Sequence, residues 1–327
     1  MKQMMSEYGA VREGGAGLID LSSRGRIRVS GSEATMFLNG LITNDMKTLA
    51  ENRWMPAAFP TVQGRLIGAV RVVRGKDSFL IDTDAESRDA VLKTISRFTL
   101  AGDFHVSDVT AETALLSIQG KRAAEVVEKV FEMSLSDLPR NGAIELPVTI
   151  IRATHTAEDG FDVVIDSAKA AEVREALINA GAQPVGEDTF EVLRIEAGIA
   201  RYGRDMDETN VVTETNLDDA VSYTKGCYVG QEIIVRIKHR GHVAKKLTGL
   251  RFDTDRPVEA GTIIKSTDGT EIGKVTSTAF SPTLGNTIGL GYVRYEHLAA
   301  DTNVMVDDSI AATVTDLPFV RGSWYQD

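Results

Sequence analysis

The sequence changes character near Lys246, and this change constrains the fold more than any other feature. Before it, short runs of β-forming residues alternate with stretches of helical spacing, as where residues 161–165 precede 168–180 and Gly181 stands as a helix stop. After it come short β-rich pieces separated by turn signals such as Asp268-Gly269. We therefore predict mixed α+β layers over residues 1–245 and a small β-barrel or sandwich over 246–327.

Composition excludes several classes of protein. A chain of 327 residues with 43% hydrophobic residues is long enough for two or three packed domains. A net charge of −11 disfavours a dedicated nucleic-acid binder, so we expect no direct nucleic-acid partner. The first twelve residues lack the apolar region of a signal peptide, no apolar run reaches the length of a membrane span, and a single cysteine cannot form an intrachain disulfide. We expect a cytoplasmic protein with no membrane contact.

The stretch Lys225-Gly-Cys-Tyr-Val-Gly-Gln-Glu232 carries the most chemical information. After it, alternation of basic residues allows a strand, but Gln231 and Glu232 in a first turn and Gly241 as a stop favour a helix over 231–240. Cys227 then lies in a glycine-flanked loop before a helix N-terminus and two residues from Lys225, and both features stabilise a thiolate. The alternative is that Cys227 is a small buried apolar residue.

These residues, with Gly226, Tyr228 and Gly230, resemble the K-G-C-Y-x-G-Q-E signature of YgfZ proteins, within the folate-binding superfamily that also contains the T-protein of the glycine cleavage system. Weaker similarities to the superfamily occur in the same order along the chain. The first is formed by residues 20–22 and 26–31, the second by 37–45, the third by 115–120 and the fourth by 156–161, where Ala157 replaces a glycine. The fifth is the block Arg194-Ile-Glu-Ala-Gly198, followed by Tyr202-Gly203 and Asp205.

The resemblance implies an α+β fold in which two intertwined, ferredoxin-like folate-binding halves surround a central hole, the second spanning roughly residues 50–150, followed by an antiparallel β-barrel. It implies tetrahydrofolate, or a one-carbon derivative, as the ligand. Glu214 occupies the position of an acidic residue on the pterin ring, where a carboxylate accepts two N–H donors, although Val212 replaces the usual proline. Tyr202 and Arg236 are further predicted folate contacts. The basic stretch from Arg236 to Lys246 is either an anchor for an anionic tail or a solvated helix face.

One departure from the T-protein pattern concerns catalysis. The T-protein has paired aspartates after a glycine-rich turn, and one assists attack of the folate nitrogen on the aminomethyl group. The corresponding stretch here, residues 63–69, has no carboxylate. A positioned acid-base group contributes ~10²- to 10⁴-fold to a rate, so we expect little aminomethyl transfer.

The resemblance to YgfZ proteins, whose relatives act in iron-sulfur assembly, implies a tetrahydrofolate-binding accessory factor for the assembly or repair of iron-sulfur proteins, including tRNA-modifying enzymes, with Cys227 and Lys225 as its reactive pair. Because a cluster normally needs four ligands, a transient cluster would be shared with a client protein or assembly factor, and no resident metal site is expected. The alternative function is a folate-dependent aminomethyl or one-carbon transferase. A cysteine hydrolase with His105, His155, His239, His242 or His297 as base, a zinc site and a pure interaction module are weaker alternatives.

Overall fold

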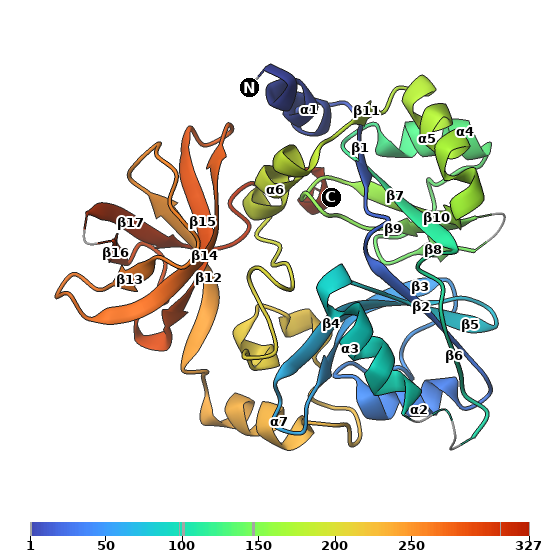
Figure 1. Cartoon of the computed structure of the whole chain (residues 1–327), viewed down its shortest axis with the longest axis horizontal. Helices are drawn as coiled ribbons and strands as arrows, with labels where there is room; N and C mark the ends of the chain where they lie inside the picture. The colour runs from blue at the N-terminus through green and yellow to red at the C-terminus, as the bar shows by residue number, and fades with distance from the viewer. Residues whose placement is uncertain (1, 98, 100–101, 146–147, 308, 327) are drawn as a thin grey trace.

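The computed structural model describes residues 2–97, 99, 102–145, 148–307 and 309–326. Two β-sheets with flanking helices form one side of the molecule, and a β-barrel lies beside them, joined to the rest by α6 and the long segment that follows it (Figure 1). The predicted α+β fold with intertwined halves is confirmed, and the C-terminal region is a closed barrel rather than a sandwich.

The two sheets are interleaved along the chain. The six-stranded sheet has the order β11-β1-β7-β10-β9-β8, and the five-stranded sheet has the order β3-β4-β5-β2-β6. The first sheet contains β1 (Gly17–Asp20), β7 (Thr113–Gln119), β8 (Ala143–Ile144), β9 (Thr149–Arg152), β10 (Gly160–Asp166) and β11 (Gln183–Pro184). The second contains β2 (Gly25–Ser30), β3 (Arg53–Pro60), β4 (Leu66–Arg74), β5 (Ser78–Thr83) and β6 (His105–Asp108). The chain thus enters the first sheet, builds the second, and returns.

Helices cover both sheets because each presents an apolar side to its strands. They are α1 (Lys2–Arg12), α2 (Ala34–Leu41), α3 (Ala85–Ser96), α4 (Ala123–Phe131), α5 (Ala170–Asn179), α6 (Glu187–Glu196) and α7 (Gln231–Arg240). Residues of α2 and α3 share a core with the five-stranded sheet, and residues of α4 and α5 share one with the six-stranded sheet. A third core includes Val73 and Leu80 from one sheet and Leu115 and Ile151 from the other, so the two halves form one body.

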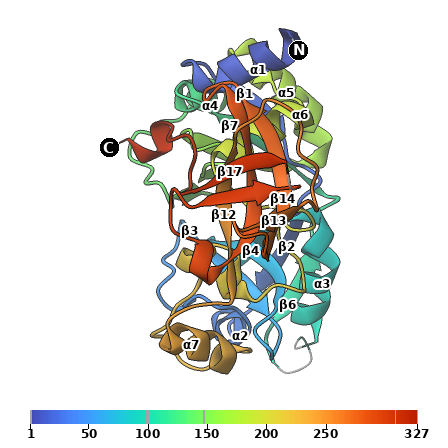
Figure 2. The same cartoon turned by 90° about the vertical axis from the view of Figure 1, so that its left-hand side faces the viewer.

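The barrel follows α7 and faces the reader in Figure 2. Its strand order is β12-β15-β14-β13-β16-β17, from β12 (Lys245–Phe252), β13 (Ile263–Lys265), β14 (Glu271–Ser281), β15 (Asn286–Arg294), β16 (Asn303–Val306) and β17 (Ile310–Thr315). All its strand pairs are antiparallel, and inward residues such as Leu250, Val275 and Val304 form its own core. The residue limits predicted for the domains stay predictions.

Polar residues of α6 and the segment after it attach the barrel to the two halves. Arg194 donates to Asp205 and to the Ser277 hydroxyl, the latter at 2.7 Å. Asp205 in turn accepts from the Ser277 hydroxyl at 2.6 Å, and Glu196 accepts from the Ser281 hydroxyl at 2.5 Å. The charged members of the R-x-E block seen in the sequence thus join the barrel to α6.

Candidate functional site

A central cavity of ≈ 410 Å³ lies where the two halves, α6 and the C-terminal segment meet. Its aromatic lining consists of Trp54, Phe190, Trp324 and Tyr325. Its ionisable lining consists of Asp20, Arg24, Arg71, Asp82, Asp84, Glu86, His155, Glu187, Arg194, Arg201 and Asp219. This volume falls in the range of ligand pockets, and flat aromatic walls beside polar groups suit a planar heterocyclic ligand.

A buried charge network forms one wall of the central cavity. Arg71 on β4 is bonded to Asp162 on β10 at 2.6 Å and to Asp82 on β5 at 3.0 Å. Arg24 is bonded to Asp82 at 2.8 Å and also to Asp84. Burial would raise the pKa of Asp82, but the neighbouring Arg24 and Arg71 guanidiniums outweigh it and lower that pKa. The Asp82 carboxylate is therefore held ionised between two guanidiniums.

His155 extends this network into the cavity. Its Nε2 lies 2.9 Å from one oxygen of Asp162 and 3.2 Å from the other. The side chain is 15% exposed, and its ring meets Phe190 edge-on with 6.4 Å between centroids. Burial tends to raise the pKa of Asp162, whereas His155 and Arg71 lower it, and the net shift is well downward. The imidazole is thus fixed in place by a carboxylate that stays charged.

The β4 wall has no carboxylate, as the sequence indicated. Ala69 lines the central cavity, while Gly68 faces away from it toward α3. A Cβ at Gly68 would lie 2.7 Å from Val91 and 3.1 Å from the Ser87 Cβ, so no larger side chain fits there. Within the stretch 63–69 of the described structure, Ala69 is the residue whose position lines the central cavity.

The loop that carries the cysteine lies against α2. Cys227 is exposed, so the expectation of a reachable sulfur is confirmed and the buried alternative is wrong. Lys225 is buried, and its ammonium donates to the carbonyls of Asn39, Ile42 and Asn44 at 2.6, 3.0 and 2.6 Å. Burial lowers the pKa of Lys225 to about 8. The Lys225 ammonium therefore holds the end of α2, and its predicted action on the sulfur stays a prediction.

The helix expected after this loop is confirmed as α7, with Gly230 before it and Gly241 after it. Gly230 has a φ of 77°, and a Cβ there would lie 2.4 Å from the Thr61 carbonyl oxygen, whereas a Cβ at Gly226 meets nothing within 4 Å. Tyr228 is buried, and its ring lies 5.0 Å from the Lys225 Nζ. Gln231 donates to the Lys225 carbonyl at 3.4 Å, and Glu232 is exposed in the first turn. Most of the motif thus shapes the loop.

The three predicted folate contacts do not line the central cavity in the described structure. Glu214 is buried and accepts from the Val211 amide at 3.2 Å. Tyr202 is also buried, its amide donates to Asp84 at 3.0 Å, and burial raises the pKa of its hydroxyl to about 12. Arg236 is exposed on α7. Their folate roles stay predictions, whereas the charge network, which sequence reasoning missed, does line the cavity.

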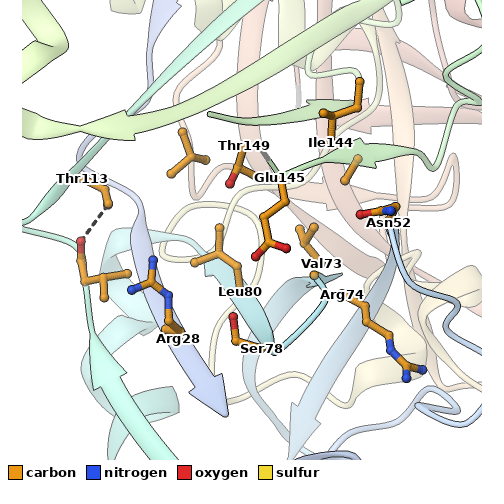
Figure 3. Close-up of a pocket in the computed structure, with 14 residues that line it drawn as sticks. Arg28, Asn52, Val73, Arg74, Ser78, Leu80, Thr113, Ile144, Glu145 and Thr149 are labelled. Carbon is orange, nitrogen blue, oxygen red and sulfur yellow. Dashed lines mark hydrogen bonds between the residues drawn. The ribbon is translucent and has the colours of Figure 1, made fainter. Parts of the chain in front are cut away.

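A smaller cavity of ≈ 50 Å³ between the two sheets is too confined for a ligand of this kind. Glu145 extends across it, accepting from the Lys76 amide at 2.9 Å, and Thr113 donates to the Val109 carbonyl at its edge (Figure 3). This site is structural.

Comparison with known proteins identifies the family. Residues 1–225 match the GCVT N-terminal domain, and residues 245–321 match the glycine cleavage T-protein C-terminal barrel domain. The chain belongs to the glycine cleavage T-protein family. An aminomethyltransferase of the T-protein family from Rubrobacter xylanophilus is 33% identical, over 97% of this chain and 86% of its own. One from Thermotoga neapolitana is 30% identical, over 98% and 90%. A crystal structure of the glycine cleavage system aminomethyltransferase T from Bartonella henselae shares the fold, with a TM-score of 0.91 at 24% identity, covering 97% of this chain and 90% of that chain.

Membership of the T-protein family confirms the broader resemblance seen in the sequence. The relatives named above are aminomethyltransferases, so the YgfZ branch and the iron-sulfur role stay predictions. Within the described residues, no three His, Cys, Asp or Glu side chains are grouped to hold a metal ion. None of the described helices combines the length and apolarity that crossing a membrane requires.

Proposed function

We propose that this protein binds a reduced folate in the central cavity and transfers an aminomethyl-type one-carbon group to or from it. The observation that carries the proposal is the cavity itself, which has room for a folate and joins aromatic walls to a buried network of ionised groups. The similarity of relatives named aminomethyltransferases over nearly the whole chain supports the same function.

The residues of the cavity fit a reduced folate. Trp54 and Phe190 offer flat apolar surfaces to a pterin ring, and Trp324 and Tyr325 do so from the C-terminal segment. Asp219 also lines the cavity, and its carboxyl oxygens can accept N–H donors from a polar pyrimidinone edge. A bound folate would supply the nucleophilic nitrogen, and the protein would hold it away from water.

The test combines binding and transfer on the same protein. Tetrahydrofolate should raise the melting temperature, since a ligand at a hundredfold excess over Kd stabilises the native state by ~2.7 kcal/mol. With an S-aminomethyl thiol as donor, the protein should then release ammonia and form methylenetetrahydrofolate. Ala69→Phe, which fills the cavity wall, should lose both effects, while Cys227→Ala should keep both. Absence of tetrahydrofolate binding by the parent protein would refute the proposal.

A second candidate function is supported by one observation, the exposed sulfur of Cys227 between glycines. In this candidate the cavity still binds folate, while Cys227 contacts an iron-sulfur client protein and any cluster is shared with that client. Cells that carry Cys227→Ala should then lose the activity of iron-sulfur and tRNA-thiolating enzymes, although the variant binds folate normally. Binding without transfer, together with this loss in cells, would favour the accessory role over the transferase.

A further inference from the structure

His155 lines the central cavity and is an ionisable residue to which the proposed function assigns no role so far. Its ring is held by the 2.9 Å contact between Nε2 and Asp162 and by the edge contact with Phe190, and its main-chain amide donates to Gln119 at 3.0 Å. Within the described residues, no hydrogen bond involves the ring Nδ1. One ring nitrogen is therefore anchored, and the other is free to exchange a proton with a ligand in the cavity.

In the ion-pair network beside His155, carboxylates outnumber guanidiniums. Arg24 and Arg71 supply two cations against the three carboxylates of Asp82, Asp84 and Asp162. The imidazole of His155 lies beside this excess of carboxylates, 2.9 Å from Asp162, and buried charges are retained when they are paired.

The other charged groups near His155 are already paired with each other. In the turn that follows it, Glu158 is bonded to Arg12 at 3.0 Å, an arginine that also binds Glu196 at 2.8 Å, and Asp159 is bonded to Arg152 at 2.7 Å. On α6, which packs Phe190 against the ring, Glu187 is bonded to Arg201. Asp20, Glu86 and Asp219 add further carboxylates to the cavity lining, and the excess of carboxylates over guanidiniums in the network that contains Asp162 lies next to the imidazole.

We propose that His155 is the proton-transfer residue of the cavity, serving as general acid for the group that leaves the one-carbon donor. This inference rests on the proposed function. It accounts for how a cavity without a carboxylate on the β4 wall can still catalyse the transfer, since His155 and Ala69 line the same space.

The step conserves atoms and charge. A folate nitrogen uses its lone pair to form a bond to the aminomethyl carbon. The bond from that carbon to the donor's leaving atom breaks, its electron pair stays on the leaving atom, and that atom takes the imidazolium proton. The folate nitrogen, now positively charged, then returns its own proton to the neutral imidazole, so His155 ends as it began.

The test uses His155→Gln with His105→Gln as the matched control. Glutamine retains an N–H donor for Asp162 but cannot exchange a proton at neutral pH. His105 is also paired with an aspartate, Asp103 at 3.0 Å, but its side chain is 71% exposed and lies outside the cavity. Tetrahydrofolate binding should stay within about twofold of the parent in both variants. The single-turnover rate with an S-aminomethyl thiol should fall ~10²- to 10⁴-fold only in His155→Gln.

Two further readouts separate a chemical role from a structural one. The parent rate should depend on pH, and this dependence should vanish in His155→Gln, which has no side-chain group that exchanges a proton at neutral pH. Added imidazole should raise the single-turnover rate of His155→Ala about tenfold and should leave the rate of His105→Ala unchanged. If the parent binds tetrahydrofolate and transfers the group, but His155→Gln keeps its rate and pH profile, the assignment of His155 is wrong while the proposed function stands. A parent that binds no tetrahydrofolate refutes both.

Discussion

The two glycines that flank Cys227 allow a sharp test of what the motif does, because the structure assigns them different surroundings. Gly230 combines a φ of 77° with a Cβ position only 2.4 Å from the Thr61 carbonyl oxygen. A left-handed conformation costs an alanine about 1–2 kcal/mol, and forcing a side chain into a packed site costs about 1–3 kcal/mol more. Gly230→Ala should therefore destabilise the protein by about 2–5 kcal/mol.

Gly226→Ala is the matched control, since a Cβ there meets nothing within 4 Å. Its effect should stay within about 0.5 kcal/mol, as for most exposed substitutions. Differential scanning calorimetry of the parent and both variants measures the melting temperatures, and alkylation of Cys227 by iodoacetamide reports whether the loop has moved. Equal melting temperatures for Gly226→Ala and Gly230→Ala would refute the argument that Gly230 is required by backbone geometry.

Four further outcomes follow from contacts described above. Ala157 has a φ of 67°, so Ala157→Gly should stabilise the protein by about 0.5–1 kcal/mol in urea denaturation; a loss of stability would contradict this. Lys225→Met leaves buried carbonyls at the end of α2 without a donor and should lower the free energy of unfolding in urea by about 2–3 kcal/mol; an unchanged value would disprove the contact. The family resemblance predicts that Glu214→Ala weakens tetrahydrofolate binding measured by calorimetry; unchanged affinity would remove Glu214 as the pterin anchor and favour the cavity lining that excludes it. The pKa of Asp162 is lower in the folded than in the unfolded state, so its stabilisation is present above about pH 4 and is lost as pH falls through the folded value; unfolding at pH 2–7 should show a weaker pH dependence for Asp162→Asn than for the parent.

Local signals predicted local structure well. The helix over 231–240 was predictable because a glycine stands at each of its ends, and the barrel because short β-rich pieces alternate with turns. Local signals alone left barrel and sandwich open, and the family resemblance favoured the barrel; closure depends on β12 pairing with both β15 and β17, which come from distant parts of the chain.

The site was harder to predict, because its members lie far apart in the sequence. Arg71 and Asp162 are 91 positions apart and meet only because their strands belong to different sheets that pack together. Lys225 shows a contact that the sequence did not indicate: its closeness to Cys227 along the chain suggested an electrostatic role, which stays a prediction, and its side chain donates to carbonyls at the end of α2. Neither arrangement leaves a periodic pattern in the sequence.

The interleaved order of the sheets determines the order in which strands can pair while the chain is synthesised on the ribosome. β1 emerges early, but β7, with which it pairs from Gly17 opposite Gln119, is made only after the whole five-stranded sheet, and β11 later still. The apolar residues Leu18 and Ile19 therefore stay unpaired and exposed while the five-stranded sheet folds. A nascent chain halted after Asp108 would hold one finished sheet and one unpaired strand, the kind of intermediate that chaperones bind. Because the chain passes from one half to the other and back around the cavity, β1 is made first but gains its second strand partner only when β11 is made.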